Sequence, residues 1–276
     1  MTAPSLSATI VTYRPHRALL ARALASLGAA VVRAREAGAL GSMTLDIVDN
    51  GPEEERGALR EVLETAWPRE AGAVELLGGQ GNVGYGRANN LVVGKLASDF
   101  HLVMNPDVEV DREALAASLR AFADDPRLGL VAPDAYGDDG ARQYLCKRYP
   151  SVWLLFLRGF APRILKRRFA RALADYEMRD VVDRGEAAAV PLASGCFMLM
   201  RTALFRRLGG FDPRFFMYFE DYDLSLRAGR EAAVAWIPAA RIVHHGGEAA
   251  RKGPRHVAWF VRSAWRFFAT HGWKLA

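Results

Sequence analysis

Cysteine is scarce in this chain of 276 residues, which contains only Cys146 and Cys196. Two cysteines exclude a disulfide framework and a zinc–cysteine cluster, and they suit the reducing cytosol. Long apolar runs are also lacking, because the longest, such as residues 152–157, fall far short of the roughly 20 residues that span a bilayer. A strand-like run follows Pro4, where a signal peptide would otherwise stand. We therefore expect a cytoplasmic protein without a spanning helix.

Acidic residues are missing from one long segment. Between Gly140 and Ala174 there is no Asp or Glu, and the segment contains nine Lys and Arg residues. The chain has a net charge of +6, and its tail after Glu248 is basic too. Both stretches carry Trp, Phe and Leu side chains, a combination that suits an anionic membrane surface or a phosphate-bearing ligand. Nucleic acid is the competing partner, but no nucleic-acid motif is present, so we do not expect it. The basic residues of the tail are Arg251, Lys252, Arg255, Arg262, Arg266 and Lys274.

Part of the acid-free segment has a helical pattern. Residues 164–173 are expected to form an amphipathic helix that starts near Pro162, with apolar side chains on one face and basic ones mostly on the other. This pattern and the similar tail favour peripheral attachment to an anionic membrane leaflet. The alternative is that both apolar faces pack on the protein's own core and the arginines are only solvated.

The first part of the chain alternates strand-like and helix-like segments. Hydrophobic residues make up 51% of the chain, enough for a sizeable core. Repeated strand–helix units imply a parallel sheet with right-handed crossovers, in an α/β fold. The expected strands are residues 7–13, 44–48, 74–77 and 100–104, and the expected helices are residues 16–37, 53–66 and 86–96. A short helix at 201–208 and a strand at 233–237 are expected later in the chain.

Polar clusters follow three of these strands. They are Thr12-Tyr13-Arg14, Asp49-Asn50 and Asn105-Pro106-Asp107. Ligands of open parallel sheets bind beyond the carboxyl ends of the strands, so three strands that deliver polar groups to one edge predict a binding site there.

Asp107 is a candidate metal ligand. A carboxylate at a strand end suits a hard divalent cation, which could also hold two phosphates. The alternative is an ordinary Asn-Pro-Asp turn. His244 or His245 could supply a second ligand through an imidazole nitrogen, although a histidine pair beside a glycine turn is more often structural.

Acids stand among aromatic residues at positions 215–224, the most informative stretch of the chain. Glu220, Asp221 and Asp223 follow Phe215, Phe216 and Phe219. An acid held among aromatics has a raised proton affinity, which suits a general base that takes a proton from an alcohol. The alternative is the first turn of a helix, where Glu220 and Asp221 complement the macrodipole and the Phe side chains pack in the core.

A glycine-rich loop at residues 78–87 resembles a phosphate-binding loop. It lacks the lysine of a P-loop, and its glycines are not spaced as in the dinucleotide-binding fingerprint. By itself the loop indicates only that its backbone closely approaches another group, which can be a ligand or another part of the protein. Arg87, Asn89 and Asn90 would add cationic and amide donors at a helix start, where anions are favoured.

Together these segments resemble the family 2 glycosyltransferases of the GT-A fold, over about residues 7 to 250. Within that family the resemblance is to bacterial rhamnosyltransferases of O-antigen and cell-wall polysaccharide assembly. Six segments occur in the family's order and spacing. They are residues 8–13, 48–50, 81–90, 105–107, the run from 209–212 to 220–224, and His244.

The resemblance implies a role for each matching residue. Asp107 resembles the last acid of the D-x-D metal motif, with Asn105 in place of the first acid, and His244 stands where a metal or diphosphate contact is often found. Asp221 resembles the catalytic base, with Glu220 as its neighbour. The residues that resemble nucleotide-sugar-binding positions are Thr12, Tyr13, Arg14, Asp49, Asn82, Arg87, Asn90 and Asn105.

The implied fold is a mostly parallel central sheet flanked by helices, with Mg²⁺ or Mn²⁺ as the cofactor. The implied domain covers residues 1–250, with a nucleotide-sugar half at 1–110, an acceptor half at 111–250, and a basic-aromatic helix at 251–276. The implied reaction moves L-rhamnose, with inversion, from dTDP-L-rhamnose to a polyprenyl-diphosphate-linked saccharide at the inner face of the plasma membrane. The alternatives are a UDP-hexose donor and a nucleotide- or glycan-binding scaffold that has lost catalysis, which retention of both Asp107 and Asp221 disfavours.

Overall fold

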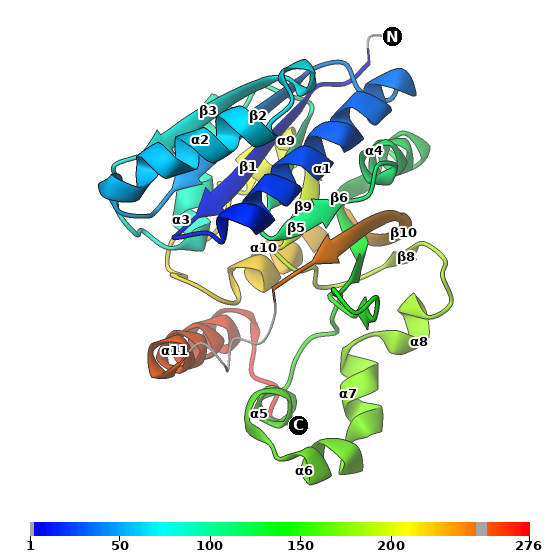
Figure 1. Cartoon of the computed structure of the whole chain (residues 1–276). Helices are drawn as coiled ribbons and strands as arrows, with labels where there is room; N and C mark the ends of the chain where they lie inside the picture. Colours follow the sequence, from blue (N-terminus) through cyan, green and yellow to red (C-terminus); the bar gives the residue numbers. More distant parts are fainter. Residues whose placement is uncertain (1–2, 247–252) are drawn as a thin grey trace.

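The computed structural model describes residues 3–246 and 253–276, so the predicted tail residues Arg251 and Lys252 lie outside the described part. One ten-stranded sheet runs through the described chain (Figure 1). Its strands are β1 (Leu6–Thr12), β2 (Met43–Asp49), β3 (Ala73–Gly78), β4 (Phe100–Met104), β5 (Val108–Val110), β6 (Leu128–Tyr136), β7 (Arg142–Gln143), β8 (Ala188–Ala189), β9 (Phe197–Arg201) and β10 (Ala233–His244).

The sheet is mostly parallel, as the sequence predicts. The main path has the order β3-β2-β1-β4-β9-β6-β10-β5. Strands β1 to β4 are mutually parallel where they pair, and β6 is parallel to β10. Strand β9 runs antiparallel between β4 and β6, and β5 pairs antiparallel with the end of β10. The segment after residue 190, which the sequence shows only as an apolar run, therefore joins the two parallel groups.

Helices cover both faces of the sheet. Helices α1, α2 and α4 pack on one face in the larger core cluster, and α3, α9 and α10 pack on the other face (Figure 1). Their bounds are α1 (Arg17–Glu36), α2 (Arg56–Ala66), α3 (Tyr85–Asn90), α4 (Ala114–Asp124), α9 (Thr202–Arg207) and α10 (Glu220–Gly229). This two-sided cover explains why β1, β2 and β4 are buried along almost their whole length.

A third group of helices lies below the sheet in Figure 1. It comprises α5 (Val152–Phe160), α6 (Arg163–Arg168), α7 (Ala170–Tyr176), α8 (Arg179–Val182) and α11 (Pro254–His271). A separate aromatic cluster joins α5, the loop before α10 and α11 through Leu155, Phe215, Phe219, Phe267 and Phe268. One face of α5 and one of α11 therefore pack internally, as the alternative interpretation of these stretches predicts. Their other faces remain exposed, with Trp265 at 62% and Phe156 at 44%.

Two predicted helices are shorter than expected. The helix expected at 164–173 is broken at Phe169, whose backbone (φ −108°, ψ 22°) separates α6 from α7. The helix expected at 86–96 ends at Asn90, and a 3₁₀ turn follows at Val93–Lys95. The side chain of Asn89 donates to the carbonyl of Tyr85 at 3.1 Å, which competes with regular helix bonding.

The strand expected at 233–237 is longer than predicted. Strand β10 extends to His244, with a register shift between Ile237 and Arg241 that accommodates Pro238. This extension carries His244 to the edge of the sheet beside Val108. Both cysteines are buried and free.

Candidate functional site

The three polar clusters predicted to share one edge of the sheet do so. Thr12 and Asp49 are register partners at the ends of β1 and β2, and β4 lies on the other side of β1. Beyond this edge lies a cavity of about 370 Å³. Its walls come from both halves of the chain, and α5, α10 and α11 close it from below. The polar lining residues are Tyr85, Asn105, Asp107, Lys147, Arg158, Ser194, Tyr218, Glu220, Asp221, Tyr222 and His244.

A strained turn brings the acid pair into this cavity. Tyr218 and Phe219 both have left-handed backbones, with φ of 70° and 65°. Each such non-glycine residue costs on the order of 1–3 kcal/mol and marks places where local geometry is fixed by its surroundings. Helix α10 begins directly afterwards at Glu220, so Glu220 and Asp221 occupy its first turn. The first-turn interpretation of this stretch is confirmed, because the acids stand where they complement the helix dipole. The same two acids also line the cavity, and their role as a general base stays a prediction.

The two acids differ in their surroundings. Asp221 accepts hydrogen bonds from the backbone N–H groups of Gly195 and Tyr222, each at 2.9 Å. Glu220 is 6% exposed, and within the described part of the chain its Oε2 has no hydrogen-bond partner. Burial, followed by the charge of Asp221, raises the pKa of Glu220 to about 8, and burial also raises the pKa of Asp221. Because Asp221 accepts from two N–H groups and Oε2 of Glu220 has no such donor among the described residues, a single negative charge on the pair is favoured on Asp221.

The third acid of the cluster, Asp223, has a structural role. Its carboxylate accepts from Arg227 at 2.7 Å and contacts His271 of α11 at 2.8 Å, and it is fully buried. Arg227 in turn donates to the carbonyls of Leu208 and Gly210. Asp223 therefore ties α10 to α11 and to the glycine turn, and it is not among the residues that line the cavity.

Asp107 and His244 face each other at the opposite wall. Nε2 of His244 lies 3.8 Å from Oδ1 of Asp107, and that oxygen has no hydrogen-bond partner among the described residues. Gly246 must be glycine, because a Cβ there would come within 2.3 Å of the Asp107 carboxylate. Gln143 donates to the His244 carbonyl at 2.9 Å, which leaves its Oε1 to accept from Nδ1 at 3.0 Å. In the neutral imidazole, the Nε2 lone pair is therefore presented on the side of Asp107.

This pair fits a hard divalent cation only in part. A carboxylate oxygen without a partner beside an imidazole nitrogen is a suitable set of two donors. In the described ranges, 3–246 and 253–276, no group of three His, Cys, Asp or Glu side chains is arranged to hold a metal. Any cation here would take its remaining ligands from a bound diphosphate and water. His245 is turned away and pairs with Glu109 and Asp138.

The residues predicted to bind the nucleotide lie at the ends of β1 and β2. Thr12 donates to Oδ1 of Asp49 at 3.0 Å, and both side chains are buried. Tyr13 is 54% exposed, and Arg14 has a left-handed backbone (φ 47°) and pairs with Glu55. None of these four residues lines the cavity, so their nucleotide contacts stay predictions.

The predicted donor-loop residues make mainly structural contacts. Asn82 accepts from the N–H of Gly84, and Arg87 donates to the carbonyl of Pro213 at 2.6 Å. The side chain of Asn90 donates to the carbonyl of Phe211 at 2.7 Å and accepts from the N–H of Phe211 at 2.8 Å. None of Asn82, Arg87 and Asn90 lines the cavity, whereas Asn105 does. Their ligand contacts stay predictions.

Sequence reasoning did not assign Tyr85, Lys147 or Arg158 to the site. The hydroxyl of Tyr85 donates to the carbonyl of Gly195 at 2.7 Å, beside Asp221. Lys147 is 3% exposed and lines the cavity with Arg158. The available signal was the acid-free segment 140–174, which contains both cations, but composition cannot distinguish cavity residues from solvated ones.

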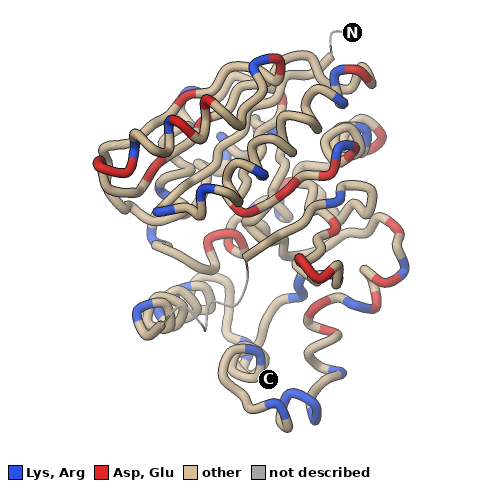
Figure 2. Tube along the Cα trace, in the orientation of Figure 1, with Lys and Arg blue, Asp and Glu red and all other residues tan. Residues whose placement is uncertain are grey.

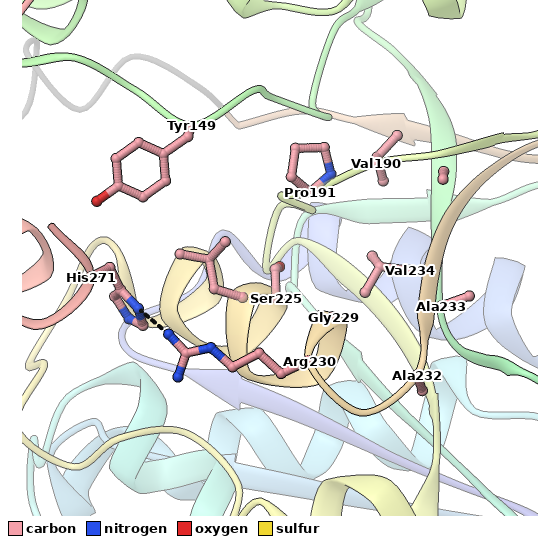
Figure 3. Close-up of a pocket in the computed structure, with 12 residues that line it drawn as sticks. Tyr149, Val190, Pro191, Ser225, Gly229, Arg230, Ala232, Ala233, Val234 and His271 are labelled. Atoms are coloured by element: carbon pink, nitrogen blue, oxygen red, sulfur yellow. Dashed lines mark hydrogen bonds between the residues drawn. The ribbon is translucent and has the colours of Figure 1, made fainter. Parts of the chain in front are cut away.

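A second cavity, of about 620 Å³, lies farther along α10, beside its second half (Figure 3). Tyr149, Pro191, Ser225 and Val234 border it, and Arg230 reaches His271 at 3.4 Å there. No carboxylate is among its lining residues. The smaller cavity, which has acids on two walls, is therefore the candidate site.

Solved structures with the same architecture are glycosyltransferases. The structure titled GalNAc-T7 with UDP, GalNAc and Mn²⁺ matches with a TM-score of 0.62 and 15% identity over 98% of this chain, which spans about half (51%) of that protein. A mannosyltransferase from Pyrobaculum calidifontis, solved with GDP-Man and Mn²⁺, matches with a TM-score of 0.57 and 18% identity, over 96% of this chain and 65% of that one. The fold is therefore the GT-A fold of nucleotide-sugar glycosyltransferases.

Sequence comparison identifies the family within this class. The chain is 30% identical over 217 residues to an N-acetylglucosaminyl-diphospho-decaprenol L-rhamnosyltransferase of Mycobacterium tuberculosis, covering 72% of this chain and 69% of that protein. It is 26% identical over 200 residues to rhamnosyltransferase WbbL of Escherichia coli K12, covering 68% of this chain and 71% of that protein. No family model matches the chain. The chain belongs to the same family as these rhamnosyltransferases, the family 2 glycosyltransferases, and is itself a glycosyltransferase.

Proposed function

We propose that the chain is an inverting glycosyltransferase that moves L-rhamnose from dTDP-L-rhamnose to a polyprenyl-diphosphate-linked saccharide. The sugar and acceptor come from the name of the Mycobacterium tuberculosis relative. The observation that carries the chemistry is that Asp107 and Asp221, from opposite halves of the chain, line one cavity. In this proposal residues 1–110 hold the donor and residues 111–250 hold the acceptor.

The proposed reaction needs one base and a stabilised leaving group. Asp221, held by two N–H groups, accepts the proton of the acceptor hydroxyl. The acceptor oxygen then bonds to the anomeric carbon while the bond to the donor diphosphate breaks and its electron pair goes to the leaving oxygen. Attack from the face opposite the leaving group gives inversion. Asp107 and His244 would hold a divalent cation, which when bound supplies positive charge to the diphosphate.

Donor choice can be tested by thermal shift with nucleotide-sugars in the presence of Mg²⁺ or Mn²⁺. Binding stabilises a protein by about 2.7 kcal/mol at a ligand concentration of 100 times Kd. For a chain of this size we expect dTDP-L-rhamnose to raise Tm by roughly 5 °C or more. Rhamnose transfer to a saccharide diphosphate should follow in a radiolabel assay. A UDP-hexose that stabilises and reacts in its place would contradict the proposed donor, and stabilisation by nucleotide-sugars without any transfer would indicate a binding scaffold that has lost catalysis.

We further propose peripheral attachment to the anionic inner leaflet, where a lipid-diphosphate acceptor would be reached. Among the described residues, no helix has the length and apolarity needed to cross a bilayer. This proposal is supported by an exposed apolar patch, which we call the aromatic patch after its three rings and define as Trp153, Phe156, Phe160 and Ile164. Basic residues gather beside it at the lower end of the α5–α7 region in Figure 2. Such residues contribute on the order of 1 kcal/mol each near an anionic surface.

Liposome sedimentation tests this attachment. We expect binding to rise with the fraction of anionic lipid and to fall with salt. Replacing Lys166, Arg167 and Arg168 by Glu should release the protein from anionic vesicles. The new carboxylates would repel the anionic lipid headgroups directly beside the aromatic patch. The matched control is the same charge change at three exposed arginines elsewhere, Arg60, Arg69 and Arg120. A protein that stays in the supernatant with anionic vesicles at low salt, or equal loss in both variants, would contradict the proposal.

A further inference from the structure

Helix α5 presents two different faces. Leu155 and Arg158, one helical turn apart, line the candidate cavity. Trp153, Phe156 and Phe160, which share another face, are exposed at 37%, 44% and 47%. One short helix therefore separates the acid pair from an exposed aromatic surface. A ligand that extends past α5 would therefore have one end in a polar cavity and the other on an apolar surface, one helix width apart.

The chain's C-terminal segment extends this apolar surface. The carbonyls of Lys274 and Leu275 accept from the N–H groups of Val152 and Trp153, at 2.8 and 3.1 Å. The tail therefore runs beside the first turn of α5, and Leu275 is 71% exposed there. Segments more than a hundred residues apart in sequence thus form one apolar rim next to the cavity.

The cavity wall next to α5 carries an excess of positive charge. Lys147 is buried, with its ammonium group donating to the carbonyl of Tyr144 and lying 5.6 Å from the ring centre of Tyr176. Its nearest carboxylate is Glu177, at 3.7 Å, and Glu177 is also held by Arg179 at 2.6 Å. Burial, followed by the positive charge of Arg158, lowers the pKa of Lys147 to about 7. Arg158 and the protonated form of Lys147 repel each other, and Glu177 is also engaged by Arg179, so an anion bound between Lys147 and Arg158 would be favoured and would stabilise the protonated lysine.

Neighbouring contacts show why Lys147 in particular faces the cavity. Arg148, the next residue, pairs bidentately with Asp180 at 2.9 Å and holds α8 instead. The backbone at Lys147 is extended and bridges to Leu192, so successive side chains point to opposite sides. Lys147 thus faces the cavity, whereas Arg148, the residue after it, has a structural role.

We propose that Lys147 and Arg158 form a subsite for the diphosphate of the acceptor. This inference rests on the proposed function, which gives the Asp107–His244 wall to the diphosphate of the donor. The acceptor's diphosphate would lie between the two cations, its saccharide would extend to Asp221, and its apolar chain would leave over Trp153, Phe156 and Phe160. The ligand class is a saccharide diphosphate ester with an apolar chain.

The test is binding measured by calorimetry without donor and in EDTA, so that no cation at Asp107 and His244 can hold the ligand. The probes are an N-acetylglucosaminyl diphosphate with a short alkyl chain and the corresponding alkyl glycoside without diphosphate. We expect Arg158→Ala to weaken binding of the diphosphate about tenfold or more and to leave the glycoside unchanged within about twofold. Lys147→Gln should act in the same way, and Arg158→Lys should recover part of the affinity.

Arg184→Ala is the matched control, because Arg184 is an exposed arginine of the same region that does not line the cavity. Arg158→Ala decides the test if Lys147→Gln does not fold, since Arg158 lies on the short surface helix α5. Unchanged diphosphate affinity in Arg158→Ala, equal loss for both probes, or no binding by the unaltered protein would overturn the subsite. Diphosphate binding that depends on Arg158 in a protein that transfers no rhamnose would contradict the proposed function and leave the subsite standing.

Discussion

Asp221→Asn is expected to reduce turnover by roughly 10²-fold or more, as for loss of a general base. The amide keeps the size of the side chain, but its single oxygen can accept from only one of the two N–H groups, of Gly195 or Tyr222, and it cannot take a proton from the acceptor. Nucleotide-sugar affinity should stay near that of the unaltered protein, because the proposed mechanism has Asp221 contact the acceptor and not the donor. The measurements are steady-state rhamnose transfer and donor binding by calorimetry.

The pH profile gives a second readout of the same residue. Asp221 must be ionised to act, so the rate should fall as pH falls through its pKa, which burial raises above the usual range of aspartate. Glu220 keeps its proton up to a pKa of about 8, so it does not compete as a base at neutral pH. Asp124→Asn, at the exposed end of α4, is the control. Turnover near that of the control in Asp221→Asn would contradict the assignment of the base.

Asp107→Ala should weaken nucleotide-sugar binding and activity together. It removes the carboxylate beside Nε2 of His244, and with it one of two protein donors for a cation. Loss of an outer-shell partner of a metal ligand alone typically costs 10–100-fold in affinity or activity, so we expect a loss of at least about tenfold here. Exhaustive chelation of the unaltered protein should have the same effect, and added Mg²⁺ or Mn²⁺ should reverse it. Donor affinity and transfer rate are measured before and after chelation.

Asp124→Ala serves as the control for this experiment, since its carboxylate lies away from the cavity. Full activity after exhaustive chelation would show that no cation is required and that Arg or His side chains hold the diphosphate. A loss of activity in Asp107→Ala with unchanged donor affinity would place Asp107 in the chemical step instead.

Much of the site was predictable because it depends on local rules. Strands that begin a strand–helix unit are parallel and end at one edge, so Asp49 and Asn105 could be assigned to that edge from their positions alone. The first turn of a helix after an aromatic run was enough to place Glu220 and Asp221 side by side. These features follow from periodicity and capping, which a single sequence contains.

Other features depended on pairing between distant segments. His244 is the last residue of β10 and His245 follows it, so the pairing of His244 with Val108 decides which imidazole faces Asp107. Arg87 and Asn90 follow the glycine-rich loop, yet Pro213 and Phe211 engage their side chains. Such contacts join residues more than a hundred positions apart, and no local pattern indicates them.

By itself the sequence determined the α/β class, the order of strand–helix units, and the two short segments that carry Asp107 and Asp221. Only the tertiary structure decided that these segments line one cavity and that Lys147 and Arg158 join them there. The physical reason is that secondary structure follows from local periodicity, whereas a cavity is made by side chains from separate elements. Their charges and burial are fixed only once the sheet and the helices below it have packed.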